Sequence, residues 1–148
     1  MGELVSAQIK NWISDQLGTS EFSVVQLAGD ASARRYYRIF QDEKTWVLMT
    51  WEPFKHADYP FLSVQRHFSE CYIQVPEVTA VGEALGVLLL EDLGDLTLER
   101  KFWEASKQEA SEDFYLKTID ELIKIHDVAT FSDSNSTALT TKFLLQLH

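Results

Sequence analysis

A short run of small residues followed by arginines is the first place where residue types and spacing suggest chemistry. The small residues are Gly29, Asp30, Ala31 and Ser32, and the arginines are Arg34, Arg35 and Arg38. Small residues let backbone N–H groups approach a phosphate, and arginines pair with phosphate oxygens. The alternative is an ordinary hairpin turn with exposed arginines, because Gly-Asp turns are common. Three arginines within five residues of an acidic chain favour phosphate binding.

A second candidate is the segment 88–95, in which three leucines lead into acidic residues and a glycine. A buried strand that ends here would expose the backbone donors and acceptors of Glu91, Asp92 and Leu93. A kinase hinge holds adenine through backbone groups of this kind. The alternative is a core strand that ends in an acidic turn, and the segment taken alone favours that alternative.

The remaining chemically active side chains predict no metal site. His126 precedes Asp127, but no second His or Cys lies at ligand spacing. We therefore expect His126 to be a packed, hydrogen-bonded residue at the end of an apolar helical face. Cys71 is the single cysteine, so it cannot form an internal disulfide, and we expect it in the core.

Elements that could position these residues follow from the hydrophobic pattern. Helical spacing predicts an amphipathic helix over 3–17, and β-forming residues predict strands over 22–28, 34–40 and 45–51. A helix over 59–71, strands over 77–81 and 87–91, and helices after Gly94 complete the order. Three apolar residues in a row predict that the last strand is buried on both faces.

This is the element order of a protein-kinase small lobe, and it predicts an α+β fold. Residues 1–93 would form a five-stranded antiparallel sheet with one inserted helix. Residues 94–148 would form a linker and the first helices of a truncated large lobe.

Composition restricts the class of protein. The chain has 148 residues, with 13 Lys and Arg against 23 Asp and Glu, and a net charge of −10. With 45% hydrophobic residues it is not intrinsically disordered, and its charge disfavours general nucleic-acid binding. No secretory signal or bilayer-spanning run is visible, so we expect a soluble cytoplasmic protein that contacts no membrane.

The two candidate segments together carry a resemblance to a known family. Gly-Asp-Ala-Ser-x-Arg-Arg-Tyr from Gly29, Val47–Met49, and Leu-Glu-Asp-Leu-Gly from Leu90 resemble the aminoglycoside phosphotransferase/choline kinase-like family. Within it, the sequence is most similar to bacterial kinases that phosphorylate the anomeric hydroxyl of N-acetylmuramate or N-acetylglucosamine. The resemblance runs from about Phe22 to His126, and the ordered pair of motifs is more specific than either motif.

The resemblance implies an ATP-dependent sugar or amino-sugar phosphotransferase. The small residues from Gly29 to Ser32 would form a hairpin over the phosphates, and Arg34, Arg35 or Arg38 would order the phosphates or the lobe. Backbone groups of Glu91, Asp92 and Leu93 would contact adenine. ATP is the implied cofactor, with Mg²⁺ expected only together with the C-terminal lobe.

Two departures from the family pattern limit what this chain is expected to do alone. The predicted third strand, Thr45–Trp51, has no lysine, because Lys44 and Lys55 lie outside it. Kinase small lobes place there a lysine that pairs with the α/β phosphates, so an arginine of the second strand is the candidate replacement. The catalytic aspartate loop and the metal-binding aspartate are absent, and Ser132–Asn135 lacks the required spacing. We therefore predict no catalytic residue and no metal ligand, and an inactive chain.

Three functional hypotheses stay open. The favoured one is the N-terminal ATP-binding portion of a sugar kinase, whose acceptor the sequence does not choose. The others are a stand-alone, non-catalytic nucleotide-binding module and an acidic interaction protein. If the large lobe is incomplete, the helices after Gly94 leave apolar faces in water, so we expect association with a second copy.

Overall fold

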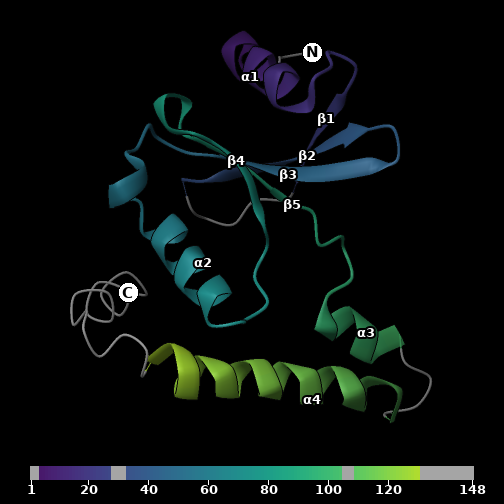
Figure 1. Cartoon of the computed structure of the whole chain (residues 1–148). Helices are drawn as coiled ribbons and strands as arrows, with labels where there is room; N and C mark the ends of the chain where they lie inside the picture. The colour runs from purple at the N-terminus through teal and green to yellow at the C-terminus, as the bar shows by residue number, and fades with distance from the viewer. Residues whose placement is uncertain (1–3, 28–32, 105–108, 131–148) are drawn as a thin grey trace. The chain divides into compact units, whose positions relative to one another are not determined.

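The computed structural model describes residues 4–27, 33–104 and 109–130 (Figure 1). Its contacts divide the chain into two units. The first contains Met1–Tyr59 and Pro76–Leu93, and the second contains Pro60–Val75 and Gly94–His148. By these contacts the inserted helix belongs with the later helices, and the boundary expected after residue 93 stays a prediction.

The first unit is built on one five-stranded antiparallel sheet. Its strands lie in the spatial order β1-β2-β3-β5-β4 and comprise β1 (Ser23–Gln26), β2 (Arg35–Gln41), β3 (Lys44–Thr50), β4 (Val78–Gly82) and β5 (Val87–Glu91). Neighbouring strands all pair antiparallel. The predicted α+β fold is confirmed.

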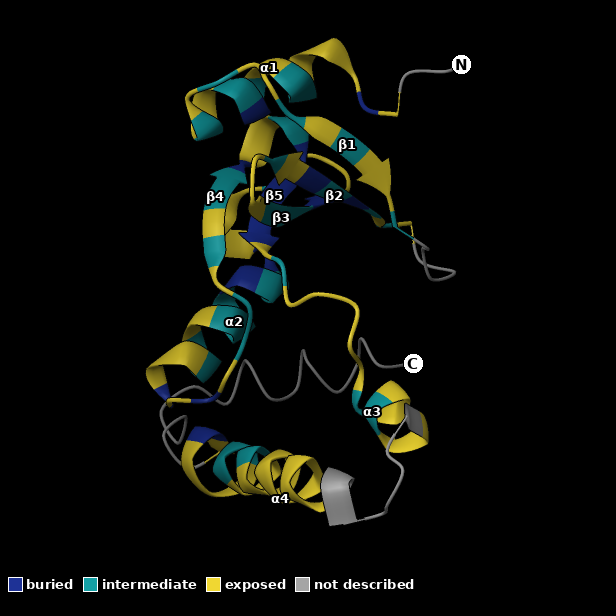
Figure 2. Cartoon of the chain, turned by 90° about the vertical axis from the view of Figure 1, so that its right-hand side faces the viewer, coloured by how far each residue is buried: buried dark blue, intermediate teal, exposed yellow. Residues whose placement is uncertain are grey.

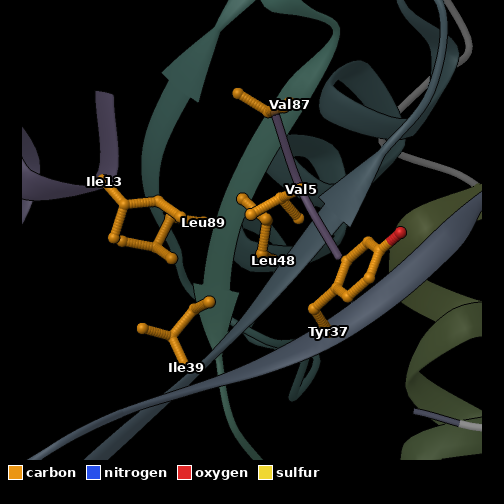
Figure 3. Close-up of a cluster of buried hydrophobic side chains, with 7 residues drawn as sticks. All are labelled: Val5, Ile13, Tyr37, Ile39, Leu48, Val87 and Leu89. Atoms are coloured by element: carbon orange, nitrogen blue, oxygen red, sulfur yellow. The ribbon is translucent and has the colours of Figure 1, made fainter. Parts of the chain in front are cut away.

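Helix α1 (Ala7–Leu17) covers one face of this sheet. Ser6 caps it by accepting a hydrogen bond from the Ile9 N–H, and Gly18 ends it at a positive φ of 69°. Ile13 on α1 is fully buried, in one cluster with Ile39 of β2 and Leu89 of β5 (Figure 3). The apolar face of α1 and every second residue of the strands, those that point toward α1, therefore pack into one core.

Gly86 fixes where β5 begins. It follows a short 3₁₀ turn, Glu83–Leu85, and has a φ of 65°. A Cβ at this position would lie 2.3 Å from the carbonyl oxygen of Trp51, and Trp51 N–H donates to the Gly86 carbonyl. Only glycine permits this close approach at positive φ. The strand that follows is buried at Val87–Leu90, as its continuous apolar pattern predicted.

The second unit consists of α2 (Pro60–Glu70), α3 (Leu98–Glu104) and α4 (Glu109–Lys124), which continues as one π-helical turn at Ile125–Ala129. Its small core contains Cys71, Ile73 and Ala129. Cys71 is buried as predicted. The prediction that His126 is packed is wrong, because this residue is exposed. Among the described histidines, His67 makes a hydrogen-bonding contact, because its Nε2 lies 2.8 Å from the Ala129 carbonyl oxygen.

Apolar side chains of α3 and α4 are widely exposed, which Figure 2 shows as the yellow of α4. Trp103 is 75% exposed, and Leu116, Ile119, Leu122 and Ile123 are each about half exposed. In the described ranges, no helix combines the length and the hydropathy that crossing a bilayer requires.

Candidate functional site

Strand β2 divides its arginines between the two faces of the sheet. Tyr37 and Ile39 point into the core beneath α1. Because successive side chains of a strand alternate, Arg35 lies on that face and Arg38 on the opposite one. Arg38 is aligned with Val25 on β1 and with Val47 on β3.

One row of side chains therefore crosses the sheet on the face opposite α1. Val47 is in turn aligned with Leu90 of β5, so the row runs Val25, Arg38, Val47, Leu90. Directly opposed residues share a face. The row has apolar side chains on either side of one guanidinium. Its β5 end leads directly into the connector, the name used here for Glu91, Asp92 and Leu93 at the end of the strand.

Arg38 and Asp92 form a nearly buried ion pair between strand and connector. Arg38 Nε lies 2.6 Å from Asp92 Oδ2, and Arg38 Nη2 donates to Oδ1 at 3.0 Å. The side chains are 13% and 4% exposed. Such a two-point contact between planar groups fixes orientation as well as distance. It ties the first residue after β5 to β2 across the intervening β3.

The connector backbone is held on one side and accessible on the other. Glu91 N–H donates to the Glu77 carbonyl at 2.8 Å, and Glu91 Oε2 accepts from the Glu77 N–H at 3.1 Å. Leu93 makes no hydrogen bond to any residue that the structure describes, and it is 67% exposed. Gly94 then turns the chain with a φ of 77°. Of the three predicted connector residues, Leu93 is thus the one whose backbone groups make no described hydrogen bond within the protein.

Arg34 lies over an aromatic platform at the other end of β2. We define this platform as Trp51, Phe54 and Tyr59. The Arg34 guanidinium carbon is 5.4 Å from the Trp51 ring centroid and 5.9 Å from that of Tyr59. Tyr59 stacks on Phe54 at 4.2 Å and on Trp51 at 5.4 Å.

The platform is anchored by Tyr59, which is only 2% exposed. Burial raises the pKa of its hydroxyl, while the nearby positive charge of Arg34 acts in the opposite direction and Tyr36 adds to the rise. The phenol therefore stays neutral at physiological pH. Its ring forms a fixed surface beneath the guanidinium.

Arg35 is separated from both of these groups. It is exposed and lines an open cleft of about 400 Å³ on the α1 side of the sheet, together with Leu4, Tyr37 and Thr50. The structure does not bring Arg35 to the face that carries Arg38. Gly29, Asp30, Ala31 and Ser32 lie outside the described residues.

The third strand begins earlier than predicted, which corrects the position of one lysine. Lys44 is the first residue of β3, opposite Gln41, because the β2–β3 turn has only two residues, Asp42 and Glu43. Asp42 takes a positive φ of 51°, as tight hairpins require. Lys44 is exposed at the turn, and the strand interior beyond it carries no lysine.

Two features of the site were not found from the sequence. The Arg38–Asp92 pair joins residues 54 positions apart, and no local pattern signals it. The aromatic platform had a visible signal, because Trp51, Phe54 and Tyr59 lie within nine residues directly after the third strand. Within the described ranges, no group of three or more His, Cys, Asp or Glu side chains gathers that could hold a metal ion.

Two comparisons with known proteins both relate the chain to phosphotransferases. The family model described as "Phosphotransferase enzyme family" matches residues 23–148. The chain is also 31% identical over 119 residues to the N-acetylmuramate/N-acetylglucosamine kinase of Neisseria meningitidis serogroup B (strain ATCC BAA-335 / MC58). That alignment covers 80% of this chain and 35% of the relative, so the chain spans about a third of the length of the curated protein it matches.

Proposed function

Because the chain belongs to the phosphotransferase enzyme family, we propose that it contributes the ATP-binding portion of an ATP-dependent kinase for a sugar or amino sugar. The membership confirms the resemblance predicted from the two motifs. The name of the relative, an N-acetylmuramate/N-acetylglucosamine kinase, supports an amino sugar as the acceptor. A cytoplasmic location, where ATP is abundant, goes with this proposal.

The connector clamped by Arg38 and Asp92 is the observation that carries the proposal. The ion pair fixes the chain after β5, so the backbone N–H and C=O of Leu93 are oriented before a ligand arrives. A purine edge needs such a donor and acceptor beside an apolar surface. Val47 and Leu90 supply apolar side chains in the adjoining row. Asp92 is accordingly proposed to act on adenine only through its backbone and its hold on the connector.

In this proposal the phosphates bind near the start of β2, at the end of the sheet away from the adenine. Arg34 and Arg38 are four residues apart, which corresponds to about 13 Å along an extended strand. An adenine at Leu93 would direct its phosphates along β2 toward Arg34 and the segment from Gly29 to Ser32. ATP supplies the γ-phosphoryl group. The residues of this chain orient it, since phosphoryl transfer depends mainly on positioning and charge stabilisation.

No residue of this chain is proposed to activate the sugar hydroxyl or to hold Mg²⁺. A second candidate function, an interaction module, is favoured by the exposed apolar side chains of α3 and α4. The two are compatible, because a nucleotide site on the sheet leaves these helices available to a partner or to a second copy.

Nucleotide titration of the 148-residue chain tests the proposal. ATP, with and without Mg²⁺, is added to isotope-labelled protein while backbone amide resonances are followed by NMR. We expect shifts at Leu93, Gly94 and Val47, and none at Glu112 on the exposed surface of α4. Unchanged resonances at Leu93 and Val47 in millimolar ATP would exclude this site.

A further inference from the structure

The cleft on the α1 side of the sheet is separate from the nucleotide site proposed above. The sheet residues that line it include Arg35 and Tyr37 of β2 and Thr50 of β3. Arg35 is opposite Thr50 in the register of the two strands, and Tyr37 follows two positions later on the same face. The volume of about 400 Å³ is within the range of small-molecule sites.

Tyr37 brings a hydroxyl group to this cleft. The residue is only 4% exposed, and it belongs to the same core cluster as Val5. In Figure 3 its hydroxyl oxygen points away from the other labelled side chains. That hydroxyl forms a hydrogen bond with none of the residues in the described ranges. Because a nearly buried hydroxyl needs a partner and Tyr37 lines the cleft, the cleft is where a ligand could supply one.

Two side chains of opposite charge line the same cleft without pairing. Arg35 and Glu52 are both exposed, and neither side chain makes an ion pair or a hydrogen bond with any residue that the structure describes. Ser6, the N-cap of α1, also lines the cleft, and the first turn of α1 has no acidic residue. The positive end of the helix dipole therefore adds to the charge of Arg35. A ligand carboxylate would be attracted to this end of the cleft and a ligand ammonium group to Glu52.

Aliphatic side chains line the rest of the cleft. Leu4 and Val5 precede α1, Ile9 lies in its first turn, and Leu85 belongs to the 3₁₀ turn before β5. Leu4 is one of the exposed large apolar residues, so an aliphatic group that covers it would gain free energy. The cleft thus combines one apolar wall with separate attractions for an anionic and a cationic group.

We propose that this cleft binds a free amino acid with an aliphatic side chain. Arg35, the Tyr37 hydroxyl and the N-terminal end of α1 would bind its carboxylate, and Glu52 its ammonium group. The aliphatic side chain would lie against Leu4 and Leu85. A zwitterion has no net charge, so the net charge of −10 does not oppose its approach as it would oppose that of a simple anion. The inference does not depend on the proposed function, since these residues belong to neither the row nor the connector.

The experiment compares four small molecules at pH 7 by NMR titration of the 148-residue chain. Leucine carries all three groups, 4-methylpentanoate lacks the ammonium group, 3-methylbutylamine lacks the carboxylate, and glycine lacks the aliphatic side chain. We expect millimolar leucine to shift the amide resonances of Ile9, Tyr37 and Thr50 in a saturable manner and to leave Leu93 unchanged. Each of the other molecules should bind about tenfold more weakly, because each loses a charge-assisted hydrogen bond or an apolar contact.

Substitutions then assign the binding groups. Arg35→Ala should weaken leucine binding about tenfold, and Tyr37→Phe about threefold to tenfold, since a neutral hydrogen bond is weaker than a charged one. Glu52→Gln should reduce the preference for leucine over 4-methylpentanoate. Lys44→Ala removes a cation at the far end of β3 and is the matched control, which should keep the wild-type affinity.

Three results would overturn the inference. These are the absence of saturable shifts with leucine, an affinity for 4-methylpentanoate or 3-methylbutylamine that equals the affinity for leucine, and a loss in Arg35→Ala no larger than that in Lys44→Ala. If ATP leaves Leu93 and Val47 unshifted while leucine binds, the proposed function fails and this inference stands.

Discussion

Sheet and helices place their apolar residues in contrasting surroundings. In β5, four consecutive residues from Val87 to Leu90 are buried, because cross-strand neighbours and the side chains on both faces enclose them. In α4, Leu116 and Ile119 are 52% and 50% exposed although their helical spacing is that of a packed face. Apolar residues therefore contribute differently to the free energy of folding in the two regions. The sheet brings together its own core and its own candidate site, whereas the apolar surface of α4 is available for contact with another surface.

A pair of leucine truncations tests this comparison most strongly. Leu89 is fully buried in the core beneath α1 (Figure 3), so Leu89→Ala should lower the free energy of unfolding by about 3 to 4 kcal/mol. Leu116→Ala, at a half-exposed helical position, should lower it by less than about 1 kcal/mol. Urea denaturation followed by circular dichroism measures both. Equal losses would mean that α4 is as well packed as the sheet.

Breaking the Arg38–Asp92 pair is the next largest change. Asp92→Ala leaves a guanidinium that is only 13% exposed without its carboxylate, which we expect to cost about 3 kcal/mol of unfolding free energy. The double variant Arg38→Met/Asp92→Leu removes both charges and should regain most of that loss. Denaturation of the single variants Arg38→Met and Asp92→Leu and of the double variant gives the coupling energy. Additive losses would show that the pair is not coupled and that the connector is held by other contacts.

The contrast between the regions also explains what could be predicted from the sequence. The strands were found because their patterns are local, and the continuous apolar run of β5 predicted burial on both faces. The family followed from two short motifs in the right order. The partner of Asp92 was not found, because pairing over 54 residues depends on which strands become neighbours. His126 was misassigned because helical spacing gives the face of a helix and leaves open what covers that face.

Self-association tests whether the exposed apolar residues of α4 contact a second copy of the chain. The expectation that the helices after Gly94 contact a second copy stays a prediction, and the exposed apolar residues of α4 supply its physical reason. Sedimentation equilibrium of the wild-type chain should give a weight-average mass above 17.0 kDa that rises with concentration. Leu116→Glu should return it to the monomer mass, while Val25→Glu, on the exposed edge strand of the sheet, should not. A monomeric wild-type chain at high concentration would contradict the expectation.

The smallest expected change in stability concerns a surface carboxylate of α4, Glu121. Glu121 Oε1 lies 2.6 Å from Lys124 Nζ, and its Oε2 accepts the Gln74 N–H at 3.1 Å. The hydrogen bond from Lys124, with a further one from Gln74, lowers the pKa of this carboxyl below the ordinary value of 4.5. The folded state thus favours the charged form, so the contribution to stability is complete above pH 4.5 and disappears as the pH falls through the lowered pKa.

The measurement for Glu121 is the difference in unfolding free energy between the wild-type chain and Glu121→Gln as a function of pH. We expect the wild type to be slightly more stable at pH 6 to 7, by a constant amount, and the difference to shrink as the pH falls below 4.5 and through the lowered pKa of this carboxyl. Glu112→Gln, at an exposed position of the same helix, controls for the removal of one negative charge. Because Gln74 belongs to the segment after α2, a difference confined to the Glu121 variant shows that this contact joins that segment to α4 in solution. A difference that does not shrink with falling pH, or that the Glu112 variant reproduces, would show that the segment after α2 is not held by this carboxylate.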